Sequence, residues 1–244
     1  MGIYTLVFSG CVILFAGIIR GYSGFGFSMI AVVSLSLVIP PAEIVPVILV
    51  LEVLASLWLL PGVWRQIHWR SLSWLSIGVL IGTPAGVYLL TNISPNFMRA
   101  AIAVVVMVLV ILLWCGFSLK TVPGRGKTVI TGLVSGVLNG SATIGGPPVI
   151  LFYLSTSTVA AVSRASLIAF FLGTDILAFV ICLTQGLVTS KTGMMCVSSL
   201  IPMILGLGVG NHFFSLSKAD AFRKKVLILL MALALIALVR AILQ

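Results

Sequence analysis

Two glycine-rich stretches carry the residues of this chain that could bind a ligand. The first reads RGYSGFGFS at 20–28, and the second reads NGSATIGGPP at 139–148. Each interrupts an apolar run, and a helix that begins after such a break presents free backbone N–H groups and a partial positive charge. New helices are expected near Phe27 and Pro147, since proline suits the first helical turn. Because neither stretch contains an acidic residue, both favour the binding of an anion.

The predicted anion site combines backbone amides, short polar side chains and two arginines nearby in sequence. The candidate substrate-binding residues are Arg20, Ser23, Gly24, Phe25, Gly26, Ser28, Asn139, Gly140, Ser141, Thr143, Gly145, Gly146 and Arg164. Arg164 and Arg20 either neutralise the substrate or extend to the aqueous surface. Phe25 and Phe27 either shield the site or pack against lipid and neighbouring helices.

Two carboxyl groups inside apolar segments are candidates for ion coupling. Glu52 lies midway along one segment and Asp175 well inside another. An ionisable group within a membrane span is costly, which makes each a functional candidate. A carboxyl group that gains and loses a proton could couple anion movement to a proton or another ion. Alternatively, each forms a structural ion pair with Arg20 or Arg164, or is a protonated acid bonded to a neighbouring helix.

The composition indicates what surrounds these residues. The 244-residue chain is 61% hydrophobic and 7% charged, whereas soluble domains carry about a quarter charged residues. It is therefore expected to be an integral membrane protein with the lipid bilayer as its main partner. The net charge of +10 would suggest nucleic acid in a soluble protein. Here most basic residues fall between apolar runs, so no nucleic acid is expected.

The apolar residues form ten segments that are expected to be helical. They are 3–19, 27–39, 42–60, 71–90, 97–118, 128–138, 147–158, 161–185, 192–214 and 222–242. A helix needs ~20 residues to cross the hydrocarbon core. The second, sixth and seventh segments are too short to cross alone, and each adjoins a glycine-rich stretch. This pattern favours helical hairpins or broken helices at those places.

Glycines at four-residue spacing recur in matching order and indicate that the chain is doubled. One set leads into each glycine-rich stretch: Gly17 and Gly21 into the first, and Gly132, Gly136 and Gly140 into the second. The fourth segment carries Gly78, Gly82 and Gly86, and its counterpart, the ninth, carries Gly206 and Gly210. Such spacing makes a flat helix face for close packing. The sequence predicts one membrane domain of two repeats, 1–118 and 128–244, joined by a linker at 119–127.

An odd number of segments in each repeat makes the two repeats enter the membrane from opposite sides. By this parity the connections 61–70, 119–127 and 215–225 share one side and carry two, three and four basic residues, against Arg99, Lys191 and Arg240 on the other. Basic residues are enriched on the cytoplasmic side. The expected fold is all-α, with inverted repeats in the plasma (inner) membrane and both termini outside.

Paired broken helices in inverted repeats are typical of secondary transporters, whose sites lie near the midplane. Lipid cannot satisfy the backbone groups that a break exposes, so the breaks must be enclosed in protein or line a watery cavity. If each hairpin reaches halfway across the membrane, the two turns meet in the middle. The residues thus predict an anion permease whose site lies where the turns meet.

The two glycine-rich stretches, GYSGFGF at 21–27 and NGSATIGGPP at 139–148, each near the start of one half, resemble those of the sulfite exporter family of the TauE/SafE type. The similarity covers nearly the whole chain. It implies a multi-pass permease, not an enzyme, for sulfite, organosulfonates or related sulfur compounds. A small oxyanion is thus the expected substrate, with no cofactor beyond a coupling proton or other ion.

Other functions compete with transport. A passive anion channel and a non-transporting membrane scaffold both remain as alternatives. An intramembrane serine protease would use Ser23 as nucleophile and needs a base within reach, but His68 and His212 lie at segment ends. A phosphate-cradle ATPase is excluded because the sequence has no complete GxxxxGK[ST] motif: Thr121 stands where the first glycine before Gly126-Lys127-Thr128 would be needed. The few histidines and acids, and four cysteines without a C-x-x-C pair, predict no metal site.

Overall fold

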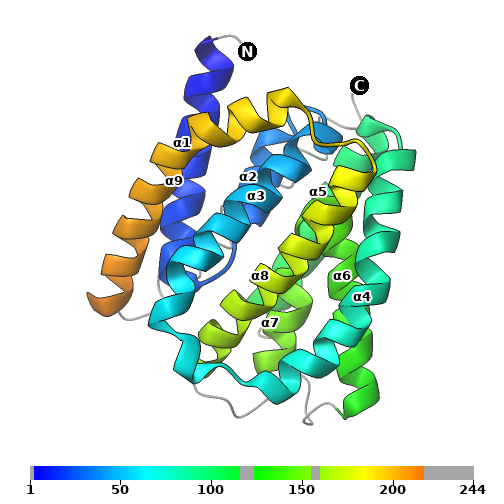
Figure 1. The fold of residues 1–244 in the computed structure, drawn as a ribbon, viewed down its shortest axis with the longest axis vertical. Helices are drawn as coiled ribbons and strands as arrows, with labels where there is room; N and C mark the ends of the chain where they lie inside the picture. Colours follow the sequence, from blue (N-terminus) through cyan, green and yellow to red (C-terminus); the bar gives the residue numbers. More distant parts are fainter. Residues whose placement is uncertain (1–2, 116–123, 155–159, 217–244) are drawn as a thin grey trace.

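The described part of the chain folds as a bundle of long helices with two short ones among them. The computed structural model describes residues 3–115, 124–154 and 160–216, and every regular element in these ranges is helical (Figure 1). The long helices are α1 (Ile3–Ser23), α3 (Pro41–Leu59), α4 (Trp69–Asn92), α5 (Pro95–Trp114), α6 (Arg125–Ala142), α8 (Ala160–Thr184) and α9 (Ser190–Leu216). The short ones are α2 (Phe27–Leu35) and α7 (Gly146–Leu154), with 3₁₀ turns η1 (Leu60–Gly62) and η2 (Trp64–Gln66). The predicted segment 222–242 lies outside the described residues.

The long helices have the length and surface of membrane spans. Among the described residues, five helices are long and apolar enough to cross a bilayer: α1, α3, α4, α8 and α9. Large apolar side chains cover their outer faces, and Leu80, Val197 and Ile201 are each more than half exposed. In water such a surface would be unusual, whereas against lipid it is expected. The chain is therefore a membrane protein.

Two expected boundaries were wrong. The sixth segment was predicted at 128–138, but α6 has 18 residues because the helix begins at Arg125 and continues through Asn139 to Ala142. The first stretch was expected to break the helix from Arg20 onward, yet α1 continues to Ser23 and the break is confined to residues 24–26. Arg20 is tolerated inside α1 because its charge is paired within the protein, as described below.

The glycine faces join helices that are far apart in sequence. Added Cβ atoms at the α4 glycines would collide with backbone carbonyls of α6: Gly78 with Val129, Gly82 with Leu133, and Gly86 with Val137. Residue numbers rise together along both helices, so α4 and α6 are parallel. Glycine alone permits this backbone approach, which supplies the van der Waals contact that holds helices together in lipid.

A second glycine-faced pair is built the same way. In α1 and α9, Gly206 meets the carbonyl of Leu14 and Gly210 meets that of Ile18, again in parallel order. Figure 1 shows the α1–α9 pair on one side of the molecule and the α4–α6 pair on the other, with α3 and α8 between them.

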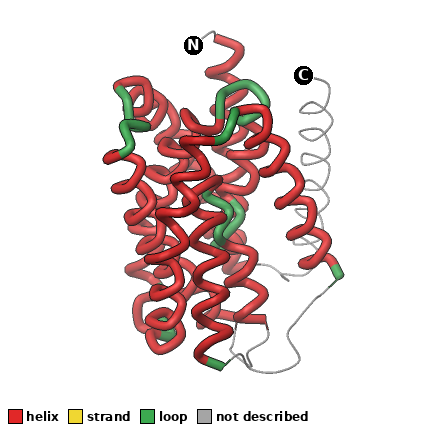
Figure 2. Tube along the Cα trace, turned by 90° about the vertical axis from the view of Figure 1, so that its right-hand side faces the viewer, coloured by secondary structure: helices red, strands yellow, loops and turns green. Residues whose placement is uncertain are grey.

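Two helical hairpins turn inside the bundle. α1 is followed by α2 and α6 by α7; α2 and α7 each have nine residues and so extend about 14 Å at 1.5 Å per residue. Figure 2 shows a loop at mid-height, within the helical body rather than at either end. The turns use left-handed backbone: φ is +79° at Gly24, +91° at Gly26 and +56° at Thr143. Thr143 is the one non-glycine residue in the described ranges with positive φ.

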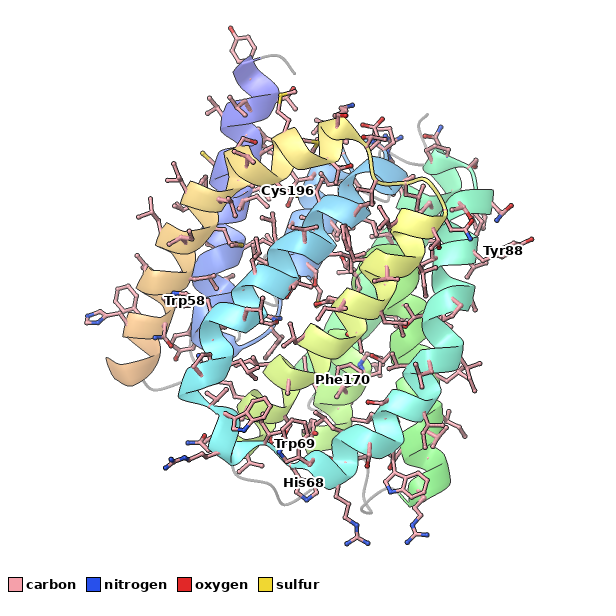
Figure 3. All side chains as sticks on the ribbon, in the orientation of Figure 1. Trp58, His68, Trp69, Tyr88, Phe170 and Cys196 are labelled. Carbon is pink, nitrogen blue, oxygen red and sulfur yellow. The ribbon has the colours of Figure 1, made fainter. Side chains whose placement is uncertain are left out.

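Apart from Arg20 and Arg164, the described basic side chains lie towards the two ends of the bundle. His68 and Trp69 mark one end in Figure 3 and Tyr88 lies near the other. Arg125 stacks over the Trp74 ring, so α6 begins at the His68 end. At the opposite end, Arg99 Nε donates to the Ser36 carbonyl (2.7 Å). Lys191 pairs with Glu43, which follows Ser36 by seven residues. The grouping of the described basic residues agrees with the predicted parity; which end faces the cytoplasm stays a prediction.

Candidate functional site

A buried ion pair lies beside the first turn. Arg20 of α1 is 0% exposed and Glu52 of α3 is 2% exposed, and Arg20 Nη1 lies 2.8 Å from Glu52 Oε2. Arg20 Nη2 also donates to Ser56 Oγ, one helical turn after Glu52 (2.7 Å). Two enclosed charges need such mutual contact because each would be expensive alone. Arg20 thus lies beside the first turn, where Glu52 neutralises its charge; its predicted contact with substrate stays untested.

Glu52 also satisfies the free end of α2. Its second carboxylate oxygen, Oε1, accepts the backbone N–H of Ser28, the second residue of the helix (3.2 Å). A helix N-terminus attracts negative charge. The N-cap residue of α2 is Gly26, which has no side chain that could cap the helix. In this conformation the Glu52 carboxylate therefore occupies the α2 N-terminus, where the sequence predicts a substrate anion; binding of a substrate there stays a prediction.

The second hairpin carries a corresponding pair with different chemistry. Arg20 precedes the turn residue Gly24 by four positions, and Asn139 precedes Thr143 by four; in each case the later amide donates to the earlier carbonyl (2.8 Å). Asn139 Nδ2 donates to Asp175 Oδ1 of α8 (2.8 Å), as Arg20 contacts Glu52 of α3. A neutral amide thus stands where the first hairpin has a guanidinium.

The start of α7 lacks the backbone donors that α2 offers. α7 opens with Gly146, Pro147 and Pro148, and proline has no N–H. Pro147, as the second residue of α7, has the position that Ser28 has in α2, so no equivalent bond to Asp175 can form there. Within the described residues, Asp175 Oδ2 and Asn139 Oδ1 have no hydrogen-bond partner, although both are enclosed.

Phe171 of α8 links the two hairpins. The Arg20 guanidinium lies over the Phe171 ring, 4.8 Å from its centroid, a distance that permits a cation–π contact. A Cβ atom on Gly146 would lie 3.0 Å from the same ring. Asp175 lies one helical turn after Phe171 on α8, and residues at this spacing share a helix face. The residues around both turns therefore form one group, called the central cluster below: Arg20, Glu52, Ser56, Ser135, Asn139, Phe171 and Asp175.

Arg164 contacts the first turn from α8. Its Nη2 donates to the Gly21 carbonyl (2.9 Å) and to Asn211 Oδ1 of α9 (3.3 Å). A Cβ atom on Gly24 would lie 2.8 Å from Arg164 Cγ, so only glycine fits between the turn and this arginine. Arg164 is half-buried, and both described acceptors are neutral oxygens. It therefore brings a positive charge to the first turn.

The remaining candidates serve the turns or the helix packing. Ser141 Oγ and Thr143 Oγ1 bond to carbonyls of their own helix end, those of Val137 and Ala142. Gly140 packs against α4, and Gly145 is held by Ser135 Oγ, which donates to its carbonyl (2.5 Å). Phe27 is buried and Phe25 half-buried, and the Ser23 side chain lies outside the described part. No three His, Cys, Asp or Glu side chains gather within the described ranges.

Three residues of the cluster were not predicted: Ser56, Ser135 and Phe171. Each lies four residues from a predicted one, namely Glu52, Asn139 and Asp175. Residues at this spacing share a helix face, so a search one turn either side of each candidate would have found them.

Comparison with known proteins agrees with this membrane architecture. The family model described as "Sulfite exporter TauE/SafE" matches residues 9–237. A curated relative from Cupriavidus necator, named "Probable sulfite/organosulfonate exporter TauE", is 26% identical over 200 residues, which cover 78% of this chain and 77% of that protein. No solved structure matches the chain. The chain therefore belongs to the sulfite exporter TauE/SafE family, whose members are membrane transporters and not enzymes.

Proposed function

We propose that this protein is a secondary transporter that moves a sulfur oxyanion, such as sulfite or a small organosulfonate, across the membrane. The substrate class is supported by the name of the relative from Cupriavidus necator, a probable sulfite/organosulfonate exporter. The single observation that carries the mechanism is the central cluster, in which residues of both hairpins converge on Phe171. Proteins with paired broken helices bind substrate at such a meeting point.

The proposed movement is alternating access between two inverted repeats, 1–118 and 128–244. Its support is the direction of the helices. α9 begins beside Glu43, where Lys191 pairs, and α1 is parallel to it; α6 is parallel to α4 and begins at the His68 end. The first helices of the two halves thus run in opposite directions. Each half also contributes one member of each glycine-faced pair, so the halves share two interfaces.

The proposed substrate site lies at the two turns, and its main cation is Arg164. Arg20 is already neutralised by Glu52. Arg164 is half-buried, and its Nη2 lies at the first turn, 2.9 Å from the Gly21 carbonyl oxygen. An arginine binds a planar or tetrahedral oxyanion through two N–H groups at once. Glu52, now at the α2 N-terminus, would give way to the substrate there when the hairpins move apart.

Flux in reconstituted vesicles tests this proposal. Labelled sulfite and a small organosulfonate are offered to proteoliposomes with and without an imposed pH gradient. Saturable flux that the gradient drives is the expected result, and unsaturable flux would instead identify a passive channel. Absence of flux for both compounds, from protein shown to be folded, would contradict the substrate class and favour a scaffold.

A further inference from the structure

The two buried carboxyl groups of the central cluster are not equivalent. Glu52 has a partner for each oxygen: Arg20 for Oε2 and the Ser28 N–H for Oε1. Asp175 has one, because Asn139 Nδ2 donates to Oδ1 while Oδ2 has no partner in the described structure. A buried acceptor left unpaired is costly, and an unpaired buried charge more so.

A single proton would satisfy both orphaned atoms. Asn139 Oδ1 and Asp175 Oδ2 belong to side chains that already share one hydrogen bond, and both are acceptors while Asp175 is ionised. A proton on Asp175 Oδ2 turns that oxygen into a donor for Asn139 Oδ1. A carboxylic acid and a primary amide then pair through two hydrogen bonds, so that both oxygens gain a partner.

The surroundings of Asp175 support the same state. Its hydrogen-bond partner is the neutral amide of Asn139, whereas Glu52 of α3 and Arg20 of α1 are paired with each other and Arg164, eleven residues earlier on α8, lies at the Gly21 carbonyl. The other titratable side chains on helices packed against α8 lie towards the ends of those helices: Glu43 on α3, Arg70 and Tyr88 on α4, Arg125 and Lys127 on α6, Tyr153 on α7 and Arg65 on η2.

We propose that Asp175 holds a proton in this conformation as a neutral acid–amide pair with Asn139, whereas Glu52 stays ionised as the partner of Arg20. Asp175 is then the proton-coupling residue and Glu52 is not. Separation of α6 from α8 breaks the pair and exposes the acid to water, which ties release of the proton to movement of the second hairpin. The coupling role rests on the transport function proposed above; the protonated pair does not.

Infrared spectroscopy of the full chain in lipid nanodiscs tests the pair directly. A protonated carboxyl group gives a C=O band above the amide bands, and the whole sequence contains only four Asp and Glu residues, so assignment is tractable. We expect such a band at neutral pH in the unmodified protein, its loss in Asp175→Asn and its retention in the control Glu43→Gln. In Asn139→Leu the band should shift to higher frequency, because Asp175 Oδ1 loses its donor. Absence of the band at neutral pH, or its survival in Asp175→Asn, overturns the proposal.

Vesicle flux separates the coupling role from the pair. Asp175→Asn is expected to fold, since an amide in place of the acid can still pair with Asn139, and to lose the response of sulfite flux to a pH gradient. Glu43→Gln should keep that response. A gradient-driven flux in Asp175→Asn would refute the coupling role. If the band behaves as expected but the unmodified protein moves neither sulfite nor sulfonate, the transport proposal fails and the acid–amide pair stands.

Discussion

Replacing Glu52 with glutamine tests the view that the central ion pair is required for folding. The introduced glutamine would have nearly the shape of the glutamate, and its amide oxygen can still accept the Ser28 N–H bond now 3.2 Å long. What the substitution removes is the negative charge 2.8 Å from Arg20 Nη1. Arg20 is 0% exposed and has no route to water, so its charge would be left without compensation.

The expected cost follows from this enclosure. Removing one partner of a buried ion pair destabilises a protein by about 3–5 kcal/mol, whereas replacing both by neutral groups of similar volume is often nearly neutral. Glu52→Gln should therefore lose about 3–5 kcal/mol of unfolding free energy. The double variant Arg20→Met with Glu52→Gln should recover most of that loss. Together with the change in Arg20→Met alone, this completes a double-mutant cycle that gives the coupling energy between the two side chains.

Unfolding of purified protein in mixed detergent micelles measures these differences. The far-ultraviolet circular dichroism signal is followed as the denaturing detergent fraction rises, for the unmodified protein, both single variants and the double variant. Glu43→Gln is the matched control, because it breaks the exposed pair with Lys191, and exposed pairs contribute at most about 1 kcal/mol. Equal small losses in Glu52→Gln and Glu43→Gln would refute the buried-pair reasoning. So would a double variant no more stable than Glu52→Gln.

Three further predictions concern the packing, the substrate and the rejected protease function. Gly206→Ala should destabilise the fold by about 1–3 kcal/mol through overpacking, because its Cβ would meet the Leu14 carbonyl; Gly208→Ala on the same helix meets nothing within 4 Å and should be nearly neutral in the same unfolding assay. Arg164→Gln should raise the sulfite concentration at half-saturation roughly 10- to 100-fold, because hydrogen bonds to a charged group contribute about 1.5–3 kcal/mol. Arg70→Gln, at an exposed position, should leave that concentration unchanged. If both variants change it equally in vesicle flux, Arg164 is not part of the site. Ser23→Ala should keep most of the flux, whereas complete loss would revive a nucleophilic role.

Hydropathy was sufficient to predict the membrane architecture, because the bilayer imposes one simple length requirement on every span. The long apolar runs became α3, α4, α8 and α9 within a few residues of their expected ends. Boundaries beside polar residues were less predictable. α6 runs on through Asn139 and α1 through Arg20, since a polar residue whose partner lies in another helix does not end its own.

Residue types alone also indicated that Arg20, Glu52, Asn139 and Asp175 matter, because polar groups in hydrocarbon are expensive wherever they lie. The sequence could not show which of these side chains pair with each other. Glycine spacing predicts a flat face but not the helix that covers it, and only the fold joined α1 to α9 and α4 to α6. In the fold, Glu52 lies against the guanidinium of Arg20, and Asp175 against the amide of Asn139. A buried charge requires a partner, and which partner it meets depends on contacts between helices far apart in the chain.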